Sequence, residues 1–236
     1  MGESTDFVKD RATKTLSAAQ QVSGVWVYQG KTIMQMQAAL IAIIGDNMAT
    51  PPIVGQEEAA SAAEQVMLAA RGDWDAQLDV LHRRTVQGVS MIKNKYRDNP
   101  AKLAVVGGLS ARGSSRKETL DEALAWESAW AQVDAAWAPL PANTLAGYKT
   151  LRNQCEEGLR DAYSDAQSAW RSEVGRLAEV VSAMEDINVA WYADALRVFP
   201  AGTAEGDMIR GTIPTTYHPP PSPPPAPPVP PTPPTP

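Results

Sequence analysis

Helical periodicity runs through most of this chain and leaves little room for any other secondary structure. Apolar residues recur at steps of three and four, as at Val8, Ala12, Leu16 and Ala19 near the N-terminus. This spacing places them on one face of a helix, whereas a half-buried strand would show apolar residues at every second position. No such alternation stands out, so the sequence predicts an all-α fold.

Turn and capping residues divide the pattern into about four long helices and one short helix. Prolines end the helical stretches, and Ser115 followed by Glu118 has the spacing of a capping box. The longest stretch, which opens at Asn143 or Thr144, would extend roughly 80 Å at 1.5 Å per residue. We therefore expect an elongated antiparallel helical bundle. Its first helix is capped at Ser4 or Thr5 and continues to about residue 45, and the others cover 56–96, 101–106, 117–137 and 144–198.

Proline usage changes abruptly towards the C-terminal end. Thirteen of the 20 prolines lie between Pro219 and Pro236. Such a run fixes φ and removes backbone donors, so it adopts polyproline II and does not join a packed core. The segment before it contains turn residues and a few separated apolar residues, and we expect an extended strap along the body. The predicted organisation is a helical bundle over 1–199, an extended strap over 200–217 and a polyproline II tail over 218–236.

The charge balance and the metal-ligating residues exclude several classes of protein. The formal net charge of −6, from 21 Lys and Arg against 27 Asp and Glu, argues against a nucleic-acid partner and a polybasic membrane-binding surface. One cysteine excludes an intramolecular disulfide framework, and two histidines are too few for a His-rich metal site. Cys155 is in helical register with Leu151 and Leu159, so we interpret it as a buried structural residue. We expect no cofactor, no metal and no enzymatic activity.

Targeting signals are not evident in the sequence. The N-terminal residues are acidic and amphipathic, without the basic region and continuous apolar core of a secretory signal. The most apolar run, residues 38–44, is much shorter than the ~20 residues that a membrane-spanning helix needs. The sequence therefore predicts a cytoplasmic protein by default, with non-classical export or assembly at a surface as the alternative.

One loop combines glycines, hydroxyl groups and cations just before a predicted helix N-terminus, where the helix dipole stabilises an anion. It does not match a P-loop or a dinucleotide-binding fingerprint, because no strand precedes it. We interpret it as a connection between helices. If it binds a ligand, the ligand is anionic and the candidate residues are Arg112, Ser114, Ser115, Arg116 and Lys117.

The leading functional hypothesis is a structural or assembly protein. Long helices of unequal length leave part of their apolar faces uncovered in a monomer, and exposed apolar faces of that size mark interfaces. The chain would self-associate into a homo-oligomer or filament through candidate interface residues Trp26, Ile33, Leu40, Ile44, Trp126, Trp130, Trp137, Trp170 and Trp191. Its Pro-rich tail would dock on a neighbouring copy or project as a spacer, with docking or modification at Tyr217, Ser222, Thr232 and Thr235.

Two other functions remain open. The chain is an adaptor if its Pro-rich tail binds a partner domain of the SH3 or WW type. It is membrane-active if the apolar segment Ile33–Ile44 inserts into a bilayer, and long helices with one such segment resemble helical pore-forming toxins in outline. Burial in a bundle or in a subunit interface explains the same segment, so we do not expect a membrane partner.

Overall fold

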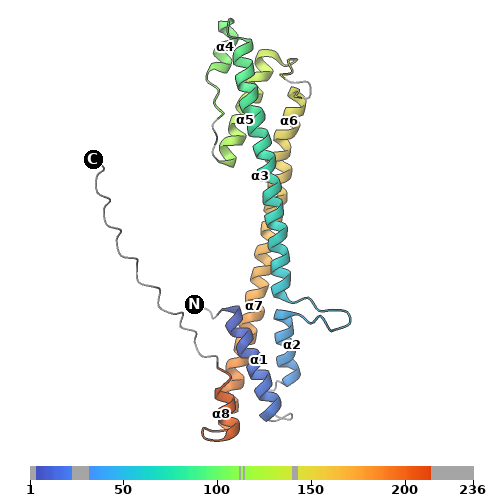
Figure 1. Ribbon diagram of the computed structural model, residues 1–236, viewed down its shortest axis with the longest axis vertical. Coiled ribbons are helices and arrows are strands. Elements are labelled where there is room, and N and C mark those ends of the chain that lie inside the picture. The colour runs from blue at the N-terminus through green and yellow to red at the C-terminus, as the bar shows by residue number, and fades with distance from the viewer. Residues whose placement is uncertain (1–3, 23–31, 112, 114, 140–142, 214–236) are drawn as a thin grey trace, which may run out of the picture. The chain divides into compact units, whose positions relative to one another are not determined.

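The secondary structure of the described residues is helical. The computed structural model describes residues 4–22, 32–111, 113, 115–139 and 143–213 (Figure 1), and these contain helices but no strand. The predicted all-α class is therefore confirmed for this part of the chain. The predicted polyproline II tail, residues 218–236, lies outside it. The helices are α1 (Thr5–Val22), α2 (Ile33–Ile44), α3 (Gln56–Lys95), α4 (Pro100–Gly107), α5 (Arg116–Asp134), α6 (Leu145–Asn153), the π-helical turn η1 (Gln154–Leu159), α7 (Arg160–Val198) and α8 (Ala204–Arg210).

The chain divides into two compact units. The larger unit is Gln37–Asp186, and the smaller unit combines Met1–Met36 with Ile187–Pro236. In the smaller unit α1 packs against α8. The buried side chains of α1 lie three or four residues apart, and Asn188 Nδ2 of α7 donates to the Val8 carbonyl at 3.5 Å. The buried face of α1 thus packs against α8 and contacts the C-terminal part of α7.

The segment expected to be an extended strap, residues 200–217, instead contains the helix α8. Thr203 caps this helix, because its hydroxyl accepts a hydrogen bond from the Gly206 amide at 3.0 Å. Ile209 has no exposed surface, so α8 contributes to the packing of the smaller unit. The strap prediction was wrong over Ala204–Arg210 because a helix of only seven residues with few apolar side chains gives too weak a periodic signal.

The larger unit has an aromatic core. α3 packs against α4, α5, α6 and η1, and α5 also packs against α4 and α6. Trp126, Trp130 and Tyr148 are fully buried at the centre of this core. Gly88 lies opposite Trp126, since a Cβ atom there would be 2.5 Å from Cζ2 of the indole. The close approach of α3 to α5 therefore depends on a residue without a side chain.

The helix boundaries agree with the sequence at several places and differ at others. α3 matches the predicted 56–96, and Ser115 forms the predicted capping box with Glu118. The first predicted helix, from a cap at Ser4 or Thr5 to about residue 45, is instead two helices, α1 and α2, on either side of residues 23–31, which lie outside the described part. α5 ends at Asp134, before the predicted 137, and there Trp130 Nε1 donates to the Trp137 carbonyl at 2.9 Å.

The long helix predicted over 144–198 is helical along that whole length, but it contains a π-helical turn. Thr144 caps α6 by accepting a hydrogen bond from the Gly147 amide at 3.1 Å. η1 has the i→i+5 hydrogen bonds of a π-helix, so this turn contains one more residue than an α-helical turn. The positions that face the core in α7 are therefore shifted by one residue relative to those in α6. Cys155 lies in this turn and is fully buried, as its register predicted.

Candidate functional site

The tryptophans predicted as interface residues fall into two groups. Trp126 and Trp130 stack with ring centroids 5.2 Å apart, and both are fully buried. Trp191 is buried in the smaller unit, and Leu40 is also buried. These four side chains are covered by their own chain in this structure. Their assignment to an interface between copies stays a prediction. The 3–4 spacing marks an inward face, and it does not say which chain covers that face.

The remaining interface candidates keep some exposure. Ile33, Trp137 and Trp170 are half-buried, and Ile44 is half-exposed. Trp26 lies outside the described residues. Trp170 is therefore the described tryptophan of α7 that retains surface in the larger unit. The tail positions Tyr217, Ser222, Thr232 and Thr235 also lie outside the described residues, so docking through them stays a prediction.

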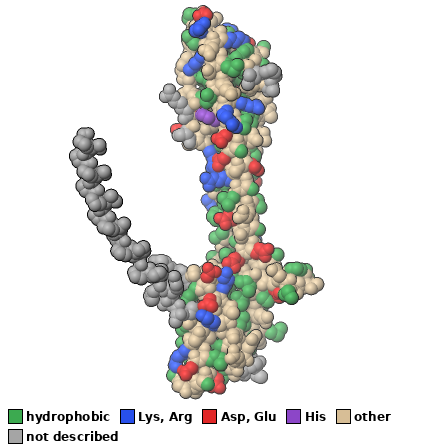
Figure 2. Space-filling model, viewed as in Figure 1, with side chains coloured by type: hydrophobic (Ala, Val, Ile, Leu, Met, Phe, Trp, Pro, Cys, Tyr) green, Lys and Arg blue, Asp and Glu red, His purple; other side chains and the backbone are tan. Residues whose placement is uncertain are grey.

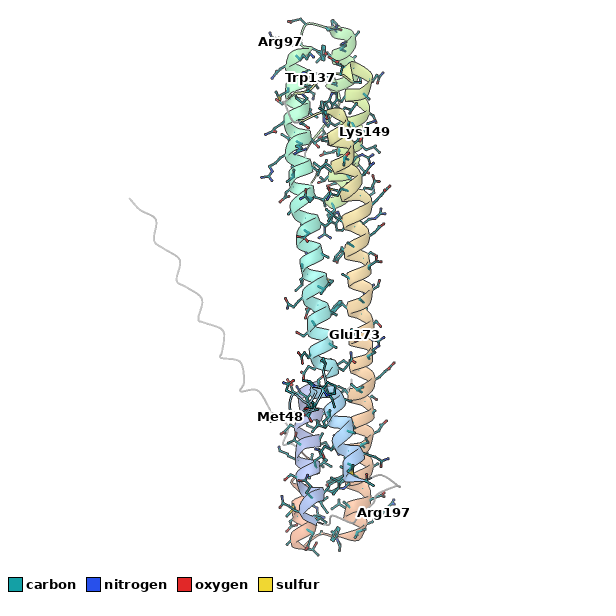
Figure 3. All side chains as sticks on the ribbon, turned by 90° about the vertical axis from the view of Figure 1, so that its right-hand side faces the viewer. Met48, Arg97, Trp137, Lys149, Glu173 and Arg197 are labelled. Carbon is teal, nitrogen blue, oxygen red and sulfur yellow. The ribbon has the colours of Figure 1, made fainter. Side chains whose placement is uncertain are left out.

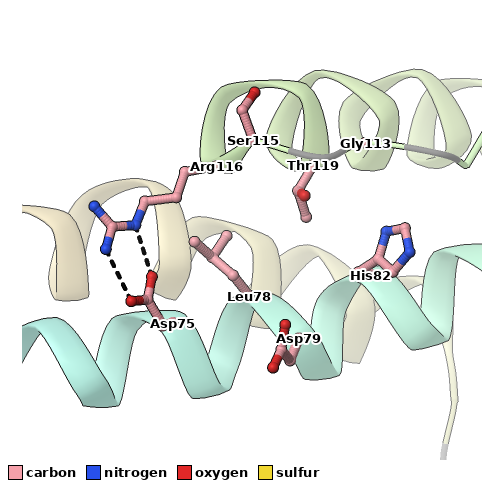
Figure 4. Close-up of a pocket in the computed structure, with 8 residues that line it drawn as sticks. All are labelled: Asp75, Leu78, Asp79, His82, Gly113, Ser115, Arg116 and Thr119. Carbon is pink, nitrogen blue, oxygen red and sulfur yellow. Dashed lines mark hydrogen bonds and ion pairs between the residues drawn. The ribbon is translucent and has the colours of Figure 1, made fainter. Parts of the chain in front are cut away.

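The loop that holds the candidate anion ligands, which the sequence indicates is a connection between helices, borders a pocket between α3 and the start of α5 (Figure 4). The pocket has a volume of about 220 Å³. Its residues are Asp75, Leu78, Asp79 and His82 from α3, and Gly113, Ser115, Arg116 and Thr119 from the other side. Two of the five predicted anion ligands, Ser115 and Arg116, thus line one pocket. Arg112 and Ser114 lie outside the described residues.

The two described cations of this loop, Arg116 and Lys117, are engaged by carboxylates of the same chain. Arg116 donates to both oxygens of Asp75, at 2.7 and 2.9 Å, and its guanidinium lies 4.5 Å from the ring centroid of Trp74. Those hydrogen bonds, more than the charge of Arg116, lower the pKa of Asp75. Lys117 pairs with Asp121 at 2.6 Å. Anion binding stays a prediction. In this structure Arg116 joins α5 to α3, whereas Lys117 forms its ion pair within α5.

Among the described residues no group of three or more His, Cys, Asp or Glu side chains could hold a metal ion. Cys155 is buried, and burial raises the pKa of its thiol, which disfavours the reactive thiolate. Likewise, no described helix has the length and apolar character to cross a membrane. In the apolar segment Ile33–Ile44, the side chains of Met36, Leu40 and Ile43 are buried.

The feature that the sequence reasoning did not single out is a two-helix stretch of the larger unit. We call it the stem: residues 56–73 of α3 and 160–183 of α7. Gln56 Nε2 donates to Glu173 Oε2 at 2.6 Å near one end. At the other end the ring of Tyr163 lies against that of Trp74, the residue that follows the α3 part of the stem, with centroids 5.7 Å apart. Figures 1 and 3 show α3 and α7 side by side here without a third helix between the two ends.

The apolar stripe of the stem is incompletely covered. No residue of the fully described range 156–183 is buried, although its helical stripe comprises Tyr163, Ala166, Trp170, Val174, Leu177 and Val181. On the α3 side Ala60 and Met67 are buried, while Val66 is 61% exposed and Leu68 is 44% exposed. Exposure cannot be read from periodicity, which explains why this surface was not singled out.

Cations are concentrated in one segment of the chain. Residues 83–117, which we call the basic segment, hold a single acid, Asp98, and nine of the 21 Lys and Arg: Arg83, Arg84, Lys93, Lys95, Arg97, Lys102, Arg112, Arg116 and Lys117. Figure 2 shows Lys and Arg side chains gathered over the part of the larger unit that carries α4. A charge count in short windows would have found this segment, which the net charge of −6 conceals.

No family model, curated protein or solved structure matches this chain. A functional assignment therefore depends on the described surface itself, above all on the stem and the basic segment.

Proposed function

We propose that this chain is a non-enzymatic structural protein. Its helices form an elongated antiparallel bundle that self-associates through the stem into a homo-oligomer or filament. The observation that carries the proposal is the stretch of α7 from Glu156 to Ala183, where an apolar helical stripe contains no buried residue. A helix of a folded protein normally buries such a stripe, because the hydrophobic effect stabilises the helix mainly through that face.

The size of the stem surface is appropriate for a protein–protein interface. Its 24 residues of α7 extend about 36 Å at 1.5 Å per residue, and two helices side by side are roughly 20 Å wide. The face they present is thus roughly 700 Å², close to the ~800 Å² that each partner contributes to a standard interface. Small residues such as Ala59, Ala62 and Ala169 let a partner helix approach closely.

Apolar surface continues from the stem into the loop that precedes α3. Met48 is 93% exposed and Val54 is 63% exposed in this loop. The ends of the loop are held together by backbone hydrogen bonds between Asp46 and Ile53, at 2.8 and 2.9 Å. Gly45 has φ of +78°, and a Cβ atom there would lie 2.6 Å from the Gly55 amide nitrogen, so the loop closes only with glycine. This loop extends the apolar surface that a second copy would cover.

Sedimentation velocity of stem variants tests the proposal. Trp170→Gln with Leu177→Gln makes the half-buried stripe polar, and we expect the concentration for half-assembly to rise at least about tenfold, or ~1.4 kcal/mol. Val189→Gln is the control, because Val189 is 51% exposed on the same helix but outside the stem. Circular dichroism checks that the variants remain helical. Equal assembly by the stem variant, the control and the unmodified chain would refute the stem as the interface.

A further inference from the structure

We infer that the partner of the stem is the basic segment of a second copy, so that the copies join head to tail. This inference rests on the proposed self-association and adds to it the surface that covers the stem. It starts from the charge distribution of the chain. With nine of the 21 cationic residues and one of the 27 acidic residues in the basic segment, the rest of the chain has 12 cationic and 26 acidic residues. Two copies therefore attract each other when unlike parts meet.

Part of the basic segment is already neutralised within the chain, and part is not. Lys95 pairs with Asp134 at 2.9 Å, and Arg116 and Lys117 pair with carboxylates as described above. Four other cations of the basic segment have no carboxylate within ion-pair distance among the described residues: Arg83, Arg84, Lys93 and Lys102. These four side chains are available to an acidic partner.

Apolar and cationic side chains share one face of α3 in the basic segment. Arg83, Val86, Ser90 and Lys93 follow each other at steps of three and four, which aligns them along the helix. Two shallow hollows of about 440 and 410 Å³ share Val86 and Ser90. Leu109 borders the larger hollow, and Lys93 Nζ donates to the Leu109 carbonyl at 3.0 Å. The face therefore has an apolar centre with cations beside it.

The stem carries the complementary arrangement. Residues 56–73 contain four acidic residues and a single Arg, and residues 160–183 contain four acidic residues and three Arg, so the stem has more acids than cations. Glu57, Glu64 and Leu68 are seven and four residues apart, so they share one face of α3. Glu64 and Leu68 of this face are exposed. An apolar surface with carboxylates beside it thus matches an apolar surface with cations beside it, whereas two stems brought together would place like charges side by side.

A contact between two different surfaces has a consequence for assembly. After one stem has bound one basic segment, each end of the pair still presents an unused surface. Such heterologous contacts form rings when the rotation closes and open filaments when it does not. A symmetric stem-to-stem contact would instead stop at a dimer.

A charge exchange tests the inference. The first variant, Arg83→Glu with Arg84→Glu, reverses charge in the basic segment. The second, Glu57→Lys with Glu64→Lys, reverses charge in the stem. We expect each variant alone to need at least about a tenfold higher concentration to assemble, and an equimolar mixture of the two to assemble again. A mixture that assembles no better than either variant alone would overturn the inference.

Arg197→Glu with Arg210→Glu is the matched control for the first variant, because it makes the same two Arg→Glu changes at positions outside both surfaces. We expect the control to assemble like the unmodified chain. Raising NaCl from about 50 mM to about 500 mM should weaken assembly of the unmodified chain, because salt screens exposed charges. If both charge variants assemble like the unmodified chain, the stems pair with each other: self-association stands and the inference fails.

Two further results distinguish a failure of the proposed function from a failure of the inference about the partner surface. If the unmodified chain is monomeric at every concentration, the proposed function itself is wrong. If it is monomeric and also binds vesicles with anionic lipid through Arg83 and Arg84, the basic segment serves a membrane surface, and the inference is overturned in favour of that partner.

Discussion

The hydroxyl groups of Tyr148 and Thr85 lie 2.5 Å apart in the core of the larger unit, and their donor order is determined by a third group. Thr85 Oγ1 is also 2.8 Å from the Leu81 carbonyl oxygen. A carbonyl oxygen only accepts, so Thr85 donates its hydrogen to Leu81 and Tyr148 donates to Thr85. Burial raises the pKa of Tyr148 above its usual value, which keeps the donor protonated.

This donor order predicts unequal costs for two substitutions. Tyr148→Phe leaves Thr85 bonded to Leu81, so we expect unfolding free energy to fall by about 0.5–1.5 kcal/mol. Thr85→Val leaves the Tyr148 hydroxyl buried without its acceptor, and the expected loss is larger, about 1–3 kcal/mol. Urea unfolding of both variants measures the difference. A greater loss for Tyr148→Phe would contradict the donor order.

The contact of Gly88 with Trp126 predicts that a substitution normally favourable in a helix is harmful here. Alanine raises helix propensity by ~1 kcal/mol over glycine, but the buried indole has no room to move, and overpacking costs about 1–3 kcal/mol. We expect Gly88→Ala to lower the unfolding free energy by about 1 kcal/mol. Gly72→Ala in the same helix has nothing within 4 Å of its new Cβ, so it should stabilise. Chemical denaturation of both proteins checks the opposite signs.

The ion pair of Asp134 predicts a defined response to acid. Hydrogen bonds from the Tyr96 hydroxyl and the Lys95 ammonium lower the pKa of Asp134 from 3.8 to about 2. A carboxyl with a lowered pKa contributes stability that is complete above its unfolded value and lost as the pH falls through its folded value. We expect Asp134→Asn to flatten the stability decrease between about pH 4 and pH 2.

Asp98 provides the control for this acid response, because Asp98 and its partner Arg97 are both exposed and their atoms are 3.7 Å apart. Asp98→Asn should leave the acid dependence of the unfolding midpoint unchanged. If Asp134→Asn and Asp98→Asn give the same profile as the unmodified chain, Asp134 makes no contribution of this kind.

Burial of Cys155 predicts slow reaction with thiol reagents. The thiol is fully buried in η1, so modification requires the core to open. We expect a thiol-reactive dye to label the native chain at least about a hundredfold more slowly than the urea-unfolded chain. Ser128→Cys in a Cys155→Ala background places a thiol at an exposed position of α5 and should react quickly. Rapid labelling of native Cys155 would show that η1 is not packed as described.

Local sequence rules predicted the helices and several of their ends. Ser115 with Glu118 and the cap at Thr144 could be located because capping depends on a few neighbouring residues. The sequence could not show which tryptophans lie in the core and which lie at the surface, because Trp126 and Trp170 both occupy apolar stripes of the same period. Only the packing of α3, α5 and α6 around Trp126 distinguishes them. The α8 helix was missed because its apolar signal is a single buried position, Ile209.

The two surfaces of the candidate interface, the stem and the basic segment, differ in whether the sequence could have located them. The stem is exposed because two helices run together without a third, which is a property of the tertiary arrangement. The excess of cations in the basic segment, by contrast, can be read from the sequence. The net charge of −6 conceals it because the rest of the chain has an excess of acids. Charge evaluated in short windows is therefore more informative here than the total.

Self-association is tested most directly by the absolute mass of the full chain, measured by light scattering after size exclusion over a hundredfold range of concentration. The proposed assembly predicts a mass that rises with concentration to multiples of the 25.3 kDa chain. A mass that stays at 25.3 kDa throughout that range would contradict it.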